Sequence, residues 1–191
     1  MDRRNFLILA AAIGLATPAI AAPRPYRLDR ENSTVGFSYQ LNGQRLTGRM
    51  PVKSASIVLD VDHPSRSRVE AVLNAARANA GPFYATAAMK SSAVLDTDNY
   101  PEIRFVSKSI ENKLNGARIK GEITIRDITR AIELNATIFR QRGTEVGDRR
   151  KMSILMTGRV NRHDFGATGF SNLVAPSIVL NILTRIELDE A

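Results

Sequence analysis

Residues 177–188 have the sequence SIVLNILTRIEL, in which apolar side chains recur at every second position. Successive side chains of a β-strand point to opposite faces, so this period of two predicts a strand. Residues 151–160 predict a second strand, and the polar residues 161–166 (NRHDFG) join the two. We expect the last strand to close a sheet begun near the N-terminus, because closure removes the exposed sheet edges.

The same alternation runs through most of the chain, and it predicts further strands at 26–29, 35–41, 46–50, 55–61, 103–110, 119–125 and 131–140. Asn42-Gly43 and Asn115-Gly116 lie between alternating runs and predict tight hairpins, because both turn positions need positive φ. About eight strands without interleaved helices predict an all-β fold, with an antiparallel barrel favoured over a sandwich.

One stretch departs from the period of two. Val69, Val72, Leu73 and Ala76 fall at helical spacing, which predicts a helix over residues 65–80 that ends at Gly81. This helix would be a short insertion in the barrel. The apolar residues 83–89 fit a helix or a strand equally well.

Residues 1–21 combine a basic start, an apolar run and a small-residue site, and so predict an export signal that is cleaved near Ala21. Residues 22–191 would then form a single barrel domain. Arg3-Arg4 fits the twin-arginine signal although Asp2 stands where Ser or Thr is usual, so general secretion and twin-arginine export both stay open. The chain has no cysteine, so burial and hydrogen bonds must hold the exported domain together.

The chain is basic, with 27 Lys and Arg residues against 19 Asp and Glu residues and a net charge of +8. Such a balance suits an anionic membrane surface or nucleic acid. The basic residues are spread along the strands, which favours a solvated barrel exterior. Export disfavours nucleic acid, and a transient contact with a membrane surface stays open.

Catalytic residues are not predicted. His63 and His163 lie in loops without a partner at metal-ligand spacing, so no metal site is expected. The sequence contains no Gly-x-Ser-x-Gly elbow and no cysteine nucleophile. An enzyme would need a titratable side chain inside the barrel, and Tyr39 and Asp164 are the two candidates.

The loop after residue 160 allows two interpretations. Asp164 could lie against Arg162 at the barrel rim, where the pair would orient the polar head of a ligand. Alternatively, the loop could cap the strand ends, with Gly166 supplying positive φ and Phe165 closing the barrel floor. The structural interpretation is favoured.

The inward-facing positions decide between a filled core and a cavity. The predicted inward residues are Phe37, Tyr39, Leu59, Met89, Phe105, Ile125, Ile138, Met156, Phe165 and Ile182. Strands of Ile, Leu and Val without any Trp could leave unfilled volume for a hydrocarbon chain. An ordinary packed core is the alternative.

Several short motifs resemble those of the YceI-like family. They are Tyr26-x-Leu28-Asp29, Val35-x-Phe37, Thr47-Gly48, Met89-Lys90-Ser91, Tyr100-Pro101-x-Ile103-x-Phe105, Gly121-x-Ile123-Thr124-Ile125 and Arg162-x-Asp164-Phe165-Gly166. The resemblance implies a lipocalin-like barrel in the periplasm with an apolar tunnel for polyisoprenoids, isoprenoid quinones or fatty-acid-like amphiphiles. The chain resembles a divergent member, because Leu41 stands where the family often has histidine and Asp127 replaces a common glycine.

We therefore expect a periplasmic carrier of an isoprenoid or fatty-acyl amphiphile, with Arg162 and Asp164 as polar groups at the rim. The predicted partner is one hydrophobic small molecule, no other cofactor is expected, and a homodimer stays open. Two alternatives remain: an enzyme of lipid or quinone metabolism, and an interaction protein with a filled barrel.

Overall fold

The structure is a computed structural model that describes residues 22–114, 116–141, 143–145 and 147–190. The export signal predicted at residues 1–21 lies outside the described residues. The strands are β1 (Arg24–Leu41), β2 (Gln44–Met50), β3 (Val52–Leu59), β4 (Arg68–Asn74), β5 (Glu102–Lys113), β6 (Gly116–Ile125), β7 (Ile128–Arg140), β8 (Lys151–Asn161) and β9 (Ser177–Leu188). One α-helix, α1 (Phe83–Lys90), and two short 3₁₀ helices, η1 (Pro64–Arg66) and η2 (Arg162–Phe165), complete the described elements.

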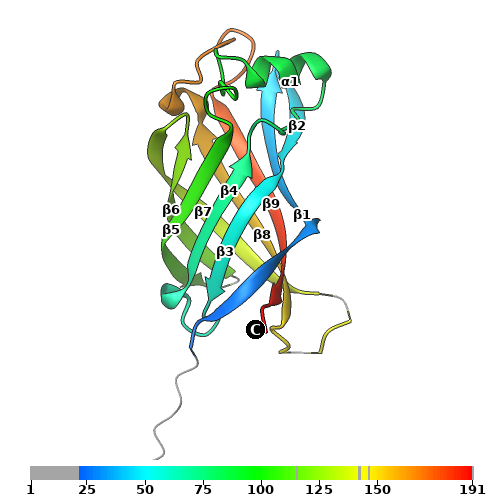
Figure 1. Cartoon of the computed structure of the whole chain (residues 1–191), viewed down its shortest axis with the longest axis vertical. Coiled ribbons are helices and arrows are strands. Elements are labelled where there is room, and N and C mark those ends of the chain that lie inside the picture. The colour runs from blue at the N-terminus through cyan, green and yellow to red at the C-terminus, as the bar shows by residue number, and fades with distance from the viewer. Residues whose placement is uncertain (1–21, 115, 142, 146, 191) are drawn as a thin grey trace, which may run out of the picture.

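The strands form one antiparallel sheet that closes on itself (Figure 1). Each strand pairs with the next along the chain from β3 to β9, and β9 returns to pair with β1. Tyr26 lies opposite Leu188 and Val35 lies opposite Ile182. The prediction that the last strand closes an antiparallel barrel is confirmed.

β2 and β3 share one position in the barrel wall. Val35–Leu41 of β1 pair with β2, whereas Arg24–Tyr26 of β1 pair with β3. Pro51 separates β2 from β3 and cannot donate a ladder hydrogen bond. The barrel therefore has eight wall positions with nine strands in the described chain.

The helix predicted over residues 65–80 is wrong. Residues 68–74 form β4, which pairs with β3 and β5. Val69, Ala71 and Leu73 also alternate, and all three line the barrel interior. Pairing on both sides of the strand overrides the helical spacing and the local alanine content.

The α-helix of the described chain is formed instead by residues 83–90, where the sequence fitted a helix or a strand equally well. α1 lies across one end of the barrel, together with the loop that follows η2 (Figure 1). We call this end the α1 end. No helix in the described ranges is both long enough and apolar enough to span a membrane.

The hairpin predicted at Asn42-Gly43 is confirmed. Asn42 has φ of 50° and Gly43 has φ of 77°, and the turn joins the paired strands β1 and β2. Positive φ at both residues matches the right-handed twist of the flanking strands. Asn115 of the second predicted hairpin lies outside the described residues, whereas the strands on either side of it pair as expected.

Candidate functional site

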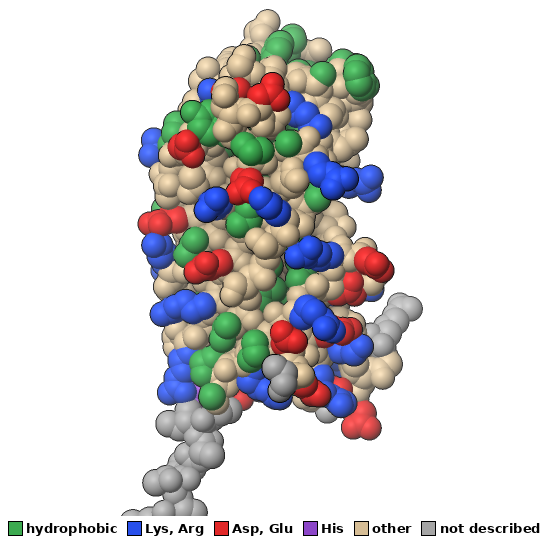
Figure 2. Space-filling view, viewed as in Figure 1, with side chains coloured by type: hydrophobic (Ala, Val, Ile, Leu, Met, Phe, Trp, Pro, Cys, Tyr) green, Lys and Arg blue, Asp and Glu red, His purple; other side chains and the backbone are tan. Residues whose placement is uncertain are grey.

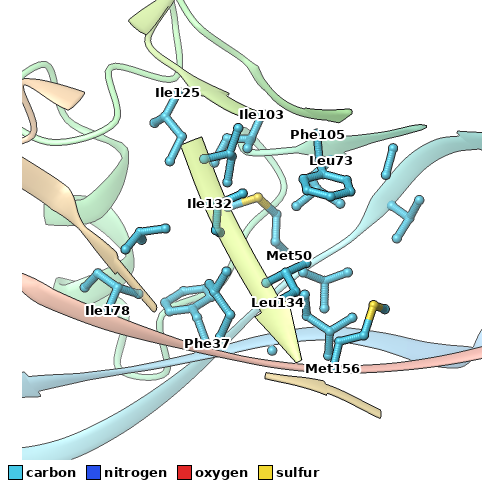
Figure 3. Close-up of a pocket in the computed structure, with 18 of the residues that line it drawn as sticks. Phe37, Met50, Leu73, Ile103, Phe105, Ile125, Ile132, Leu134, Met156 and Ile178 are labelled. Atoms are coloured by element: carbon cyan, nitrogen blue, oxygen red, sulfur yellow. The ribbon is translucent and has the colours of Figure 1, made fainter. Parts of the chain in front are cut away.

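The interior of the barrel is a cavity of about 700 Å³. Side chains from all nine described strands and from α1 line it, and almost all of these side chains are apolar. The lining extends from Tyr84 and Leu173 at the α1 end to Asn112 and Ile138 near the opposite end. In Figure 3, labelled side chains that include Phe37, Leu134 and Met156 surround a common space. A hollow of this volume is the size of a small-molecule binding site.

Small inward-facing residues explain why the barrel stays hollow. Gly36, Ala55, Ala71, Ala117 and Ala136 all line the cavity, and each contributes little volume. The chain has no Trp to fill the middle. The interior is therefore hollow, and the alternative of a filled barrel core is wrong.

The structure brings together the apolar residues that were predicted to face inward. All ten lie on the cavity wall: Phe37, Tyr39, Leu59, Met89, Phe105, Ile125, Ile138, Met156, Phe165 and Ile182. Ile138 is nevertheless 41% exposed and lies near the end of β7. Phe165 is only 2% exposed and belongs to the main core cluster, close to the α1 end.

Arg162 lies on the cavity wall, but backbone carbonyl oxygens already accept the hydrogen bonds of its guanidinium. Its guanidinium is buried and donates hydrogen bonds to four carbonyl oxygens of the loop after η2. These oxygens belong to Ala167, to Gly169 at 2.8 Å, to Val174 at 3.0 Å and to Ala175 at 3.3 Å. Burial lowers the pKa of this guanidinium. The side chain therefore fixes the loop that borders the cavity.

Asp164 does not lie against Arg162, so the first of the two interpretations of this loop, a polar pair at the rim, is wrong. Asp164 is exposed, and it is absent from the residues that line the cavity. The physical reason is that carbonyl oxygens of the loop already take the Arg162 donors. Gly166 has φ of 69° and caps η2, as the structural interpretation of this loop predicted.

Tyr39 is the buried titratable side chain that the sequence placed inside the barrel. It is 8% exposed, and its hydroxyl donates a 2.7 Å hydrogen bond to the carbonyl oxygen of Ala80. Burial raises the pKa of the Tyr39 phenol, so the phenol is neutral at physiological pH. This hydroxyl ties β1 to the segment that leads into α1.

We predict that Tyr39→Phe lowers stability by about 1 kcal/mol, because it removes this hydrogen bond and leaves the Ala80 carbonyl unpaired. Thermal denaturation followed by circular dichroism should show a melting temperature lower by roughly 2–4 °C. Lipid binding should persist, because the phenyl ring still lines the cavity. Loss of binding at unchanged stability would instead assign the hydroxyl to the ligand.

Sequence reasoning missed lining residues in two places. Ala71 and Leu73 were assigned to a helix, although their alternation with Glu70 and Val72 was a visible signal of a strand. Tyr84 in α1 carried no such signal, because an apolar run of this length has no decisive period. Among the described residues, no three His, Asp or Glu side chains come close enough together to hold a metal ion.

The chain is similar to known proteins in sequence and in structure. The family model of the YceI-like domain matches residues 26–187. Protein YceI of Salmonella newport is 23% identical over 169 residues, which cover 87% of this chain and 88% of that protein. A UPF0312 protein of Shewanella sp. (strain ANA-3) is 27% identical over 135 residues, which cover 68% of this chain and 71% of that protein.

Solved structures share the fold. BcnA of Burkholderia cenocepacia superposes with a TM-score of 0.73 at 15% identity, covering 83% of this chain and 99% of BcnA. A polyisoprenoid binding domain of Saccharophagus degradans gives a TM-score of 0.62 at 12% identity, covering 86% of this chain and 99% of that domain. The family model spans nearly the whole barrel, from the first residues of β1 to the end of β9. The chain therefore belongs to the YceI-like family.

Proposed function

We propose that this chain is a periplasmic carrier that holds one isoprenoid, quinone-like or fatty-acyl amphiphile in its barrel. The observation that carries the proposal is the apolar cavity of about 700 Å³ that extends along the barrel axis. The related domain of Saccharophagus degradans is described as polyisoprenoid binding, and this supports the same class of ligand. The export signal predicted at residues 1–21 supports the periplasmic location.

Apolar burial would supply the affinity. Each buried methylene contributes roughly 0.8 kcal/mol, so about ten methylenes would gain roughly 8 kcal/mol before the cost of immobilising the ligand. Few of the lining residues are polar, and among them the Tyr39 hydroxyl and the Arg162 guanidinium donate to backbone carbonyls. The other polar lining residues are Asn42, Asp60, Ser67, Tyr84, Asn112 and Thr184. The site therefore selects for length and apolarity of the chain more than for a particular head group.

Binding and release describe this site better than bond-making. Of the two candidate groups for an enzyme, Asp164 lies outside the cavity lining and Tyr39 has its hydroxyl engaged. Asp60 also lines the cavity and is buried. Its Oδ1 accepts hydrogen bonds from the backbone amides of Asp62 and His63, and its Oδ2 lies 3.7 Å from the Arg66 guanidinium. An enzyme of lipid or quinone metabolism would have to use this carboxylate, which already holds the turn after β3.

Extraction of the purified protein with organic solvent, followed by mass spectrometry, tests the proposal. We expect about one hydrophobic molecule per chain, and we expect delipidated protein to gain thermal stability when an isoprenoid quinone or a fatty acid is added. An empty extract without any stabilisation by added lipid would contradict a carrier.

The cavity also predicts a dependence on chain length. Ala71 of β4 faces the cavity between Ala55 and Phe105, so Ala71→Phe should fill space that a long ligand occupies. If the ring displaces about two methylenes, affinity for a long-chain fatty acid should fall roughly 15-fold, while a shorter chain should be less affected. Binding titrations with a series of fatty acids measure this.

Val72→Phe is the matched control, because Val72 is the next residue in β4 and does not line the cavity. Equal effects of the two substitutions on all chain lengths would show that the ligand lies elsewhere.

A further inference from the structure

The α1 end carries a group of exposed apolar side chains. Phe83 and Tyr84 of α1 are 89% and 65% exposed, and Phe170 and Leu173 of the loop after η2 are 44% and 41% exposed. No residue of α1 is buried. Tyr84, Phe170 and Leu173 also line the cavity, so this apolar surface is continuous with the interior of the barrel.

The two sequence segments that form this end of the barrel contain basic residues and no acidic residue. Residues 32–59 and 71–95 contain no Asp or Glu, whereas their basic residues include Arg45, Arg49, Arg77 and Lys90. The two segments are also adjacent in space, because the backbone amides of Arg49 and Asn79 donate to each other's carbonyl oxygens at 2.8 and 2.9 Å. In Figure 2, the surface over α1 and β2 at the upper right shows hydrophobic and basic side chains and no acidic ones.

We propose that this face, formed by α1, β2 and residues 75–81, docks on an anionic phospholipid surface and directs the cavity toward the bilayer. The inference rests on the proposed function, since it concerns how a lipid would enter the same cavity. Aromatic side chains favour the membrane interface, and nearby Arg and Lys are attracted to anionic head groups. A lipid surface is the occupant that matches both the positive charge and the continuity of the apolar patch with the cavity.

The absence of Trp from the chain allows a direct test in the mature protein, residues 22–191. Phe83→Trp places a single indole on α1 at a side chain that is 89% exposed. On vesicles of phosphatidylcholine with about a third phosphatidylglycerol, its fluorescence should shift to shorter wavelength as the indole leaves water. Phe139→Trp is the matched control: Phe139 is 50% exposed on β7 and lies outside the cavity lining, so the emission of that variant should not move.

The charge contribution is tested by co-sedimentation with the same vesicles. The triple variant R45Q/R49Q/R77Q should bind roughly a hundredfold more weakly, since each basic residue near the surface contributes about fivefold. The control variant R68Q/K113Q/R140Q removes the same charge from strand ends opposite the α1 end, and it should bind nearly as well as the parent. Raising the salt concentration should release the parent protein and should have little effect on the triple variant.

Failure of docking can be separated from failure of the carrier function. Phe83, Arg45, Arg49 and Arg77 do not line the cavity, so their variants should still bind free fatty acid in solution. Retained lipid binding with lost vesicle binding supports the proposal. Equal association with neutral and anionic vesicles, an unmoved emission of the Phe83→Trp variant, or no association with vesicles at all would overturn it.

Discussion

Replacement of Met156 by glutamate should abolish lipid binding, whereas the same replacement at the neighbouring Leu155 should leave binding intact. Met156 of β8 lines the cavity and lies opposite Ile182 of β9 and Ala136 of β7. A carboxylate here would have to lose its water when a hydrocarbon chain enters, without gaining any partner. We expect affinity to fall at least a hundredfold, or about 3 kcal/mol.

Leu155 is a strict control because it differs from Met156 by one position in the same strand. It is 41% exposed and does not line the cavity, so the carboxylate of the Leu155→Glu variant would stay in water. Uptake of a fluorescent fatty acid measures binding, and circular dichroism shows whether each variant keeps its strands. Undiminished uptake by folded Met156→Glu protein would place the ligand outside the barrel.

The second large effect is expected at Arg162. Arg162→Gln should lower the free energy of unfolding by about 3 kcal/mol, because four buried or partly buried carbonyl oxygens of residues 167–175 lose a charged donor. For a chain of this size, the melting temperature should fall by roughly 6–12 °C. Thermal denaturation followed by circular dichroism measures both quantities.

Two further variants separate the possible causes. Arg162→Lys keeps the charge but cannot reach four carbonyl oxygens in a fixed plane, so it should lose most of the same stability. Arg159→Gln removes an exposed charge from β8, just before η2, and should change stability little. Full stability of Arg162→Lys would mean that charge, not the hydrogen-bond network, is what the fold requires.

The barrel wall was predictable because its residues obey a simple period. The alternation of Ile178, Leu180 and Ile182 specifies both a strand and its inward face, and all three side chains lie on the cavity wall. The Asn42-Gly43 turn was predictable for a similar reason, since its backbone conformation restricts the residues that can adopt it.

What could not be predicted depends on contacts between distant segments. The β4 residues fit both the helical and the strand pattern. Their pairing with β3 and β5 determines that they form a strand. Arg162 donates to the loop at residues 167–175 because that loop folds back over its guanidinium. No local sequence pattern indicates the path of this loop. Whether the interior is hollow depends on the summed volume of side chains from every strand.

The pairing of β9 with β1 also governs the order in which the barrel can form. Tyr26 pairs with Leu188, so the barrel is closed by pairing between the first and the last strand of the described chain. Until β9 pairs, the other eight strands leave one edge of β1 open, and no earlier segment can complete the ring. Pairing between segments so far apart in sequence makes folding slow. Until β9 pairs, the open edge of β1 can associate with other chains. A chain that stopped before the twelve residues of β9 would therefore lack a barrel altogether, not merely one strand of it.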